Sequence, residues 1–474
     1  MARFAIILLA LFSITAYSFK FGVLNDIHYD PYFDPSESVS DMCRKNSPIH
    51  IPENMVNAWS SPFGHFGCDS PPELVDLVLE KIQDLEPDLD VLLVSGDFLA
   101  HGFAVKDGTP DHYDLLKETF EKVLMTLSDH LPNTIILPAI GNNDIKYHYT
   151  APRQNDEAPD YYEFLSDIMF DKMPGNKFLN KKSINKTLLK YGYYRVDIST
   201  KLSVLSVNSL YQNTVNPSKE EDIKLGQFEW IEDQLKGSES NRKFIFFFHI
   251  YPGIYEAYNQ NIFWEEDLTE RFVDMMEKYS DNVALVLGAH THFGDIRIHQ
   301  KVLDPTSPSQ DINGYLSDYI SPKSHKNEIQ RSDAKFPMLI TPSITPIFLN
   351  NPGATLFEVN KSTITNVRFV FMELYKFPKT KEDADFKIVS FKDEFGLDEF
   401  NAATVQDFIQ RSENSYNLFY MKALPYKIGY FGLLRSISWY IYSQLGAISI
   451  WSNKKYHCMS RHITTSDFNK CLGK

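Results

Sequence analysis

Seven side chains of the metal-ligating types follow apolar, β-prone segments of this 474-residue sequence. They are Asp26, His28, Asp97, Asn142, His249, His290 and His292. Carboxylate, imidazole and amide groups bind divalent metals through O and N atoms. Seven such ligands are too many for one ion and suit two, with the Asp97 carboxylate as the natural bridge. Two ions about 3.5–4 Å apart activate water and polarise phosphoryl oxygens in phosphate ester hydrolysis, so the pattern predicts that chemistry.

Five buried strands are needed to position these ligands. The apolar segments that predict them are 20–25, 90–95, 133–140, 243–248 and 283–287. In an open α/β sheet the carboxyl ends of the strands meet at one edge, where ligands bind. Singly the signals are weak: a Gly-Asn turn explains Asn142 more simply than a ligand does, and His249 fits a core residue equally well. The prediction depends on all five strands ending in ligand types.

The remaining pattern predicts an α/β fold with a helical C-terminal part. Amphipathic helices are expected over 71–85 and 111–127, a further helix from Gly226, and a hairpin over 354–359 and 364–372. We expect a catalytic domain over 19–375 and a helical C-terminal subdomain over 376–474. The apolar-rich segment 428–451 contains Arg435 and Gln444, which favours a buried helical pair over a membrane span, with docking on a lipid surface as an alternative.

Residues 1–18 have the pattern of a signal peptide. Arg3 precedes an apolar run over 4–12, and a small-x-small site ends at Ser18. We therefore expect a secreted protein or one of a lysosome-like compartment of the secretory pathway. Disulfides and glycosylation are compatible with that compartment. Pairing Cys43 with Cys68 and Cys458 with Cys471 is the simplest of three connectivities, and Asn185 and Asn360 begin glycosylation sequons.

The net charge of −15 disfavours nucleic acid as a partner. No obligate protein partner is expected, and contact with a membrane surface would be transient. Tyr147 and Tyr149 follow the third ligand-bearing strand, where aromatic side chains could line a substrate pocket or surround a choline group.

The motifs Asp26-x-His28, Gly96-Asp97, Gly141-Asn142, His249 and Gly288-x-His290-x-His292 together resemble the calcineurin-like metallophosphoesterase superfamily. Finer motifs, such as Cys68-Asp-Ser-Pro, Gly96-Asp-x-x-x-His101, Thr341-Pro-Ser-Ile-Thr-Pro346 and Asn351-Pro-Gly353, resemble the acid sphingomyelinase-like phosphodiesterases. The resemblance implies a four-layer sandwich of two mixed β-sheets flanked by helices.

The resemblance also implies two sets of ligands that share Asp97. One ion would be held by Asp26, His28, Asp97 and His292, and the other by Asp97, Asn142, His249 and His290. Zinc suits this mixture best, while Mn, Fe, Co or Mg would also bind. The expected enzyme is a metal-dependent phosphoric diester hydrolase that acts on a small-molecule or lipid substrate, such as sphingomyelin, CDP-choline or a nucleotide.

This sequence departs from the family pattern at the position of the catalytic acid. The family usually has Gly-Asn-His, and its His protonates the leaving group, whereas Asn143 stands here. We expect His101 to supply the proton instead, unless the natural leaving group is good enough to need none. Gly141-Asn-Asn143-Asp is also similar to endopolyphosphatases, although the acidic charge argues against a polyanion. A phospholipid- or phosphate-binding protein without turnover is the alternative of a different class.

Overall fold

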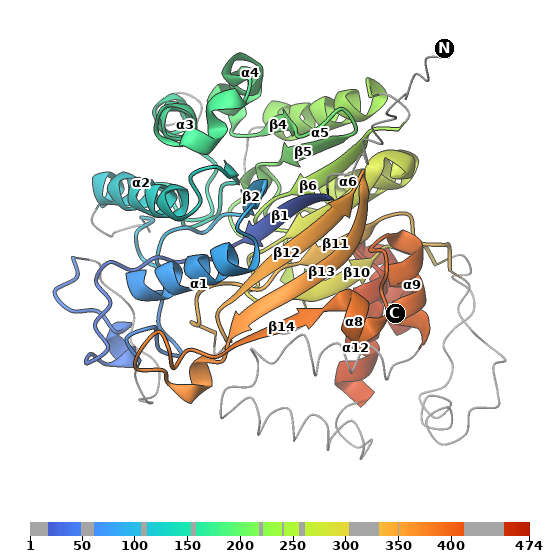
Figure 1. Cartoon of the computed structure of the whole chain (residues 1–474). Coiled ribbons are helices and arrows are strands. Elements are labelled where there is room, and N and C mark those ends of the chain that lie inside the picture. The colour runs from blue at the N-terminus through green and yellow to red at the C-terminus, as the bar shows by residue number, and fades with distance from the viewer. Residues whose placement is uncertain are drawn as a thin grey trace, which may run out of the picture.

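The computed structural model describes residues 18–48, 61–105, 111–152, 158–217, 221–238, 241–255, 261–302, 331–348, 350–411 and 450–474. Two six-stranded mixed sheets pack together, with helices outside them (Figure 1). The predicted architecture, two mixed β-sheets flanked by helices, is confirmed.

The first sheet combines three parallel strands with three antiparallel ones, in the order β14-β13-β12-β1-β2-β3. The parallel strands are β1 (Ser18–Leu24), β2 (Val91–Val94) and β3 (Ile135–Pro138). The antiparallel strands are β12 (Gly353–Asn360), β13 (Thr363–Met372) and β14 (Phe386–Ser390). The expected hairpin is formed by β12 and β13, and β12 pairs with β1.

The second sheet has a parallel centre and antiparallel edges, in the order β10-β11-β9-β6-β5-β4. Its strands are β4 (Tyr194–Asp197), β5 (Leu202–Ser206), β6 (Lys243–Phe247), β9 (Val283–Gly288), β10 (Asp295–Ile298) and β11 (Pro337–Ile340). A separate two-stranded ribbon is formed by β7 (Ile254–Tyr255) and β8 (Asn261–Ile262). Both faces of the central strands are covered, which explains why the sequences of these strands are continuous apolar runs.

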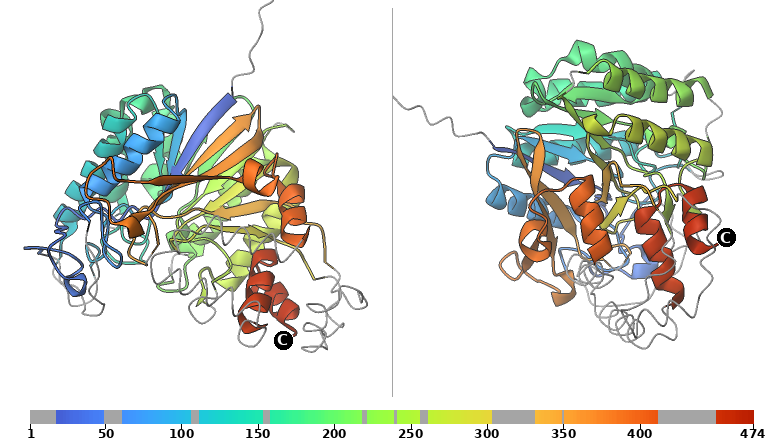
Figure 2. Two further views of the ribbon diagram at one scale, coloured as in Figure 1. Left: turned by 60° about the horizontal axis from the view of Figure 1, so that its bottom comes forward. Right: turned by 90° about the vertical axis from the view of Figure 1, so that its right-hand side faces the viewer.

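Helices flank the two sheets on both sides (Figure 2). Those before β9 are α1 (Pro72–Leu85), α2 (Tyr113–His130), α3 (Ala158–Asp167), α4 (Lys181–Tyr191), α5 (Glu221–Lys236) and α6 (Glu266–Lys278). The C-terminal ones are α8 (Phe391–Phe395), α9 (Ala402–Arg411), α12 (Ile450–Arg461) and α13 (Thr465–Leu472). The face predicted for α1 is buried, with Leu74 and Ile82 almost inaccessible.

The C-terminal part contains one strand as well as the expected helices. β14 pairs with β13, so the first sheet continues past residue 375. This strand is short, lies at an edge and carries Lys387, so its sequence shows little apolar pattern. Most of the apolar-rich segment 428–451 lies outside the described residues. Among the helices that the structure describes, none is long and apolar enough to cross a membrane.

Both expected disulfides are present, Cys43–Cys68 and Cys458–Cys471. The expected signal peptide lies outside the described residues except for Ser18, which begins β1. Of the two sequons, Asn360 is exposed at the turn between β12 and β13. Asn185 is half-buried within α4 and its amide is hydrogen-bonded to Ser166.

Candidate metal centre

The fold brings all seven predicted ligands together at the carboxyl ends of five parallel strands. Those of the first sheet follow β1, β2 and β3, and those of the second follow β6 and β9. In that order they are Asp26 and His28, Asp97, Asn142, His249, and finally His290 with His292. Their side chains meet where the two sheets adjoin, so each sheet supplies part of one site.

The first group of ligands lies around Asp26. Its Oδ1 is 3.3 Å from His292 Nε2 and 3.8 Å from His28 Nε2. His28 Nε2 also lies 3.4 Å from Asp97 Oδ2. Asp26, His28 and His292 therefore form a buried cluster of the size that one metal ion requires.

The second group lies on the other side of Asp97. His249 Nε2 is 3.2 Å from Asp97 Oδ2 and 2.9 Å from Asn142 Oδ1. His290 Nδ1 is 3.2 Å from His249 Nε2. The same Asp97 oxygen thus faces a histidine of each group, as a bridging carboxylate would.

The residues present fit two divalent ions. Asp26 Oδ1 and His28 Nε2 are buried without a hydrogen-bond partner among the described residues. His28 donates from Nδ1 to the Leu99 carbonyl at 2.9 Å, and His249 does the same to the Ser95 carbonyl at 2.9 Å. These bonds turn the Nε2 atoms toward the carboxylates, which is how metal-binding histidines are usually oriented.

Backbone strain is concentrated at this site. Five of the candidate ligands have positive φ angles, a conformation that costs about 1 kcal/mol or more for a residue with a Cβ. They are Asp26, His28, Asp97, His290 and His292, at 45°, 46°, 54°, 72° and 63°. Strain of this kind persists where the surrounding structure imposes it, and it is typical of functional sites.

The carboxylates create a field that favours positive charge. Burial alone would lower the pKa of His28 and His249, yet Asp26 and Asp97 raise both to about 9. Burial would raise the pKa of Asp97, but His249 and His28 hold it well below its usual range. For His290 and His292, burial dominates and lowers the pKa to about 3. The centre of the site therefore suits a cation beside ionised Asp97.

Asn143 and Asp144 hold Asp97 in place; the sequence singled out Asn143 only at the position of the catalytic acid, and it did not single out Asp144. The Asn143 side chain and backbone N–H donate to Asp97 Oδ2 and Oδ1, each at 2.8 Å. Asp144 accepts from the backbone N–H of Asp97 at 2.7 Å, of Phe98 at 2.7 Å and of Gly141 at 2.8 Å. The signal for Asp144 was its place in the Gly-Asn-Asn-Asp motif.

His101 lies beside the first ligand group. Its ring stacks on His28, with ring centroids 4.1 Å apart and planes 9° apart. Its side chain is 31% exposed, whereas that of His28 is fully buried. Asp69, which lies in the Cys68-Asp-Ser-Pro motif, accepts from His101 Nδ1 at 2.9 Å; the motif alone does not predict this contact.

The aromatic residues expected at the site have different positions. The Tyr149 hydroxyl lies 3.4 Å from His290 Nε2, at the second ligand group. Tyr147 lines a separate small cavity with Tyr113 and Tyr161. Phe348, which the sequence did not single out, is 40% exposed, and its ring centroid lies 4.5 Å from that of His292.

Comparison with known proteins agrees with this geometry. The calcineurin-like phosphoesterase family model matches residues 19–294, which contain all seven candidate ligands. The chain belongs to the calcineurin-like phosphoesterase family. Members of this family use a binuclear metal centre, and the two ligand clusters around Asp97 correspond to one.

Similarity to three known proteins indicates the kind of phosphoesterase more narrowly. Sphingomyelinase phosphodiesterase D of Dictyostelium discoideum is 24% identical over 396 residues, covering 78% of each chain. Cyclic GMP-AMP phosphodiesterase SMPDL3A of Bos taurus is 23% identical over 72% of this chain and 67% of its own. Human acid sphingomyelinase-like phosphodiesterase 3b is 23% identical over 73% and 69%. The expected resemblance is confirmed, and the chain is a metal-dependent phosphodiesterase.

Proposed function

We propose that this protein is a secreted binuclear-metal phosphodiesterase that cleaves a phosphodiester or pyrophosphate bond in a choline-, nucleotide- or lipid-type substrate, such as sphingomyelin or CDP-choline. The observation that carries the proposal is the convergence of six buried ligand groups and half-buried His290 at one site centred on Asp97. A secreted chain with a signal peptide over 1–18 would also carry glycan, for which exposed Asn360 is better placed than half-buried Asn185.

Each of the two ligand groups would hold one ion. Asp26, His28 and His292 would hold one, and Asn142, His249 and His290 the other, with Asp97 shared. Four histidines among seven ligands favour zinc over magnesium, which prefers oxygen ligands. When bound, such a pair of ions activates water and offsets the charge that develops on the phosphoryl group.

His101 is the group that we assign as general acid. Water oxygen joins phosphorus, the bond from phosphorus to the leaving oxygen breaks, and that oxygen takes a proton. Asn143 cannot supply it, and its amide is already engaged with Asp97. His101 is partly exposed beside the first ligand group, and its Nδ1 is bonded to Asp69, so Nε2 is the nitrogen left to face a substrate.

Aromatic side chains would contact the rest of the substrate. Phe348 lies next to both His292 and His101, with ring centroids 4.5 Å and 6.5 Å away. An exposed ring there would stack on a base or contact a choline cation. Tyr149 would contact the other end of the substrate, because its ring lies beside that of His290. Tyr147 lines the separate small cavity with Tyr113 and Tyr161.

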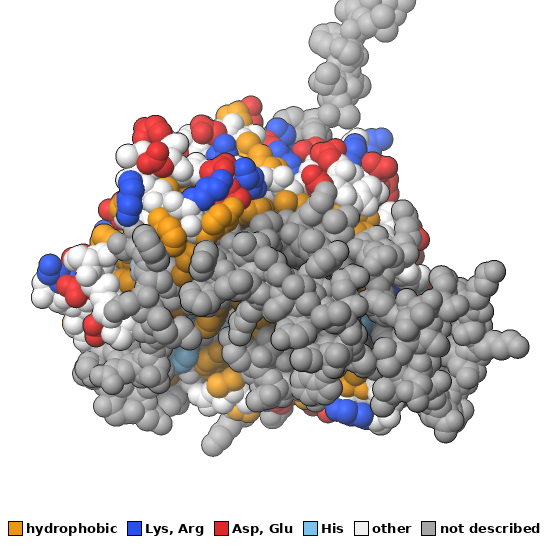
Figure 3. Space-filling view, turned by 90° about the horizontal axis from the view of Figure 1, so that it is seen from below, with side chains coloured by type: hydrophobic (Ala, Val, Ile, Leu, Met, Phe, Trp, Pro, Cys, Tyr) orange, Lys and Arg blue, Asp and Glu red, His pale blue; other side chains and the backbone are white. Residues whose placement is uncertain are grey.

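The surface suits a small or lipid substrate better than a long polyanion. On the face shown in Figure 3, the described side chains include hydrophobic groups beside histidine, while acidic and basic groups are visible at the upper, left and lower edges. With the net charge of −15, this favours brief contact with a membrane surface over binding to nucleic acid or polyphosphate. We propose no obligate protein partner.

The proposal is tested by metal content and turnover together. The purified protein should bind two divalent ions and hydrolyse bis(p-nitrophenyl) phosphate, and chelation should abolish that activity until Zn, Mn, Co or Mg is returned. A panel of sphingomyelin, CDP-choline, ATP and polyphosphate, with product identification, then defines the substrate. Preferred cleavage of polyphosphate would instead indicate an endopolyphosphatase, and two bound ions without turnover would indicate a binding protein.

His101→Ala tests the assignment of the acid. We expect kcat for a substrate with an alkoxide leaving group to fall by about 10²-fold or more, because a general acid contributes roughly that factor. A p-nitrophenolate leaving group needs no proton, so its loss should be much smaller. An unchanged rate with the poor leaving group would contradict the assignment.

A further inference from the structure

A single buried carboxylate, Asp69, holds both the ring and the backbone of His101. Its Oδ1 accepts from His101 Nδ1 at 2.9 Å, and its Oδ2 accepts from the His101 backbone N–H at 2.8 Å. Asp69 itself is fully buried. It therefore sets where the imidazole lies and which ring nitrogen remains for a substrate.

Arg44 completes this arrangement from the opposite side. Its Nη2 donates to Asp69 Oδ2 at 3.1 Å and its Nη1 to the His101 carbonyl at 2.9 Å, while its Nε is paired with Asp30. The Arg44 side chain is 2% exposed. A buried guanidinium bonded to Asp69 makes this carboxylate a poor place for a metal ion, although Asp69, His28 and His101 lie close enough to form a third ligand cluster.

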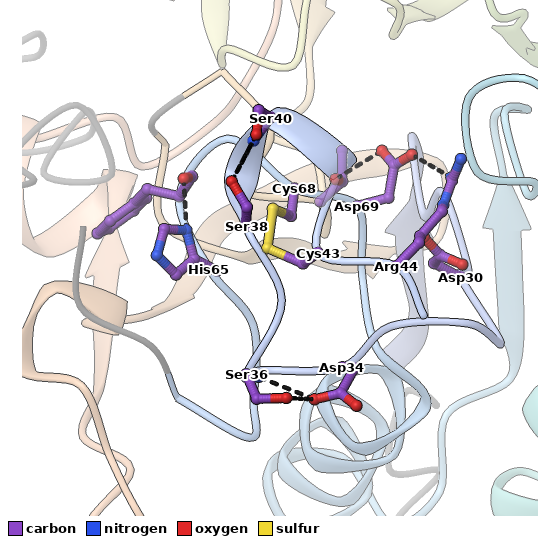
Figure 4. Close-up of a disulfide and its surroundings, with 12 residues drawn as sticks. Asp30, Asp34, Ser36, Ser38, Ser40, Cys43, Arg44, His65, Cys68 and Asp69 are labelled. Carbon is purple, nitrogen blue, oxygen red and sulfur yellow. Dashed lines mark hydrogen bonds and ion pairs between the residues drawn. A yellow bond between two sulfur atoms is a disulfide. The ribbon is translucent and has the colours of Figure 1, made fainter. Parts of the chain in front are cut away.

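The Cys43–Cys68 disulfide ties the two partners together covalently. Arg44 directly follows Cys43, and Asp69 directly follows Cys68 (Figure 4). Both cysteines are fully buried. Cys43 also has a φ of 55°, so the chain turns sharply just before Arg44. The cross-link thus fixes the two loops at the positions from which Arg44 and Asp69 reach each other.

We propose that Asp69 is a positioning residue for His101, and that Arg44 and the Cys43–Cys68 disulfide hold Asp69 in place. This inference rests on the proposed role of His101 as the acid. The Cys43–Cys68 disulfide would thus affect catalysis although it contributes no atom to the site. Loss of the cross-link would weaken proton delivery to the leaving group while leaving the ligands of both metals intact.

The test compares methyl aryl phosphates whose phenols differ only in acidity. For each variant, the ratio of kcat/KM for the p-nitrophenyl ester to that for the phenyl ester reports proton delivery. We expect Asp69→Asn to raise this ratio by about 10-fold or more, approaching the effect of His101→Ala. When Asp69→Asn and His101→Ala are combined, the ratio should be no higher than in His101→Ala alone, because both residues contribute to the same proton transfer.

The cysteines provide a matched pair of variants. Replacing Cys43 and Cys68 by Ser should raise the ratio as Asp69→Asn does. Replacing Cys458 and Cys471, which form the distant disulfide, should leave the ratio unchanged. If the first pair does not yield folded protein, Arg44→Lys takes its place, since a lysine cannot contact Asp69, Asp30 and the His101 carbonyl together.

The outcomes separate the inference from the proposed function. If the wild-type protein with two metals hydrolyses neither ester, the proposed function is wrong and the inference fails with it. If the wild-type protein is active but Asp69→Asn slows both esters equally, loses metal, or multiplies the effect of His101→Ala, only the role of Asp69 is overturned.

Discussion

At the scale of single residues, the Asn143 side chain supports Asp97 and is not a proton donor to the substrate. The family resemblance predicts a histidine at this position, but here the amide donates to the carboxylate that faces both ligand groups. A hydrogen bond to a ligating carboxylate fixes its orientation, and the loss of such a partner typically weakens metal binding by 10–100-fold. Asn143 is therefore better regarded as a support for Asp97 than as a failed acid.

Asn143→Ala should lower metal affinity by roughly 10–100-fold and leave the fold intact. The backbone N–H of residue 143 still donates to Asp97 Oδ1, so binding is weakened and not abolished. Competition with a chelator measures the effect, and Asn216→Ala, at an exposed position, is the control. Equal affinity in both variants would show that the amide does not support Asp97.

The convergence of the candidate ligands was predictable from sequence, but the residues that support them were not. Asp26 and Asp97 each follow an apolar strand, and that local pattern is visible without coordinates. The contact between Asp69 and His101 joins residues 32 positions apart in two irregular loops. Neither loop has a periodicity that fixes its path, so no pattern in the sequence could have paired these two residues.

At the scale of elements, the site depends on the close approach of the turns that follow β2 and β3. Gly96 has a φ of 87°, and a Cβ on it would lie 2.6 Å from the Gly141 backbone N. A Cβ on Gly141 would lie 2.2 Å from both the N and Oδ1 of Asp97. The two glycines let neighbouring strands present Asp97 and Asn142 side by side.

Gly141→Ala should displace Asp97 and remove most bound metal. The clash is with backbone and a buried carboxylate, which cannot move away cheaply, so we also expect a loss of about 1–3 kcal/mol of stability. Gly226→Ala is the matched control, because a Cβ there meets nothing within 4 Å in α5. That variant should gain up to about 1 kcal/mol. Metal analysis and denaturant unfolding measure both, and full metal content in Gly141→Ala would contradict the argument.

The elements themselves were largely predictable, and their assembly was less so. Apolar runs located the strands that bear the ligands, and turn residues located the β12–β13 hairpin. The sequence did not show that this hairpin pairs with β1, more than 300 residues earlier. It also did not reveal β14, whose five residues lie at an edge and are mostly polar or exposed. Pairing over such distances is set by packing between surfaces that no local pattern describes.

At the scale of the whole molecule, a disulfide joins the C-terminal helices α12 and α13 to each other, and buried polar contacts attach them to the second sheet. α12 packs against β10, and His462, just beyond α12, donates from Nδ1 to the Gln300 carbonyl at 2.7 Å. Its Nε2 is buried and has no hydrogen-bond partner among the described residues. Burial lowers the pKa of His462 to about 3; the hydrogen bond to the Gln300 carbonyl and the charge of Asp467 oppose this shift, and Arg331 and His299 add to it.

This attachment should weaken in acid. An unfolded histidine has a pKa of about 6.5, so below that pH the unfolded segment takes up a proton that folded His462 refuses. The stability is therefore complete above pH 6.5 and is lost progressively as the pH falls toward 3. At pH 5 the loss is about 2 kcal/mol for this residue alone. Hydrogen exchange of α12 and α13 between pH 7.5 and 5 should show it, after correction for the intrinsic exchange rate.

His462→Gln should make that pH dependence less steep, because glutamine does not titrate, even if the variant is less stable at neutral pH. His299, whose pKa burial lowers to about 4, would account for the slope that remains. His112→Gln, at the start of α2 and without a side-chain capping bond, should keep the slope of the wild-type protein. A steep slope that persists in His462→Gln would mean that other groups control acid release of the C-terminal helices. β10 pairs with β11, and β11 with β9. Release of α12 should therefore reach β9, the strand that His290 and His292 follow, so metal retention at pH 5 should follow the same slope.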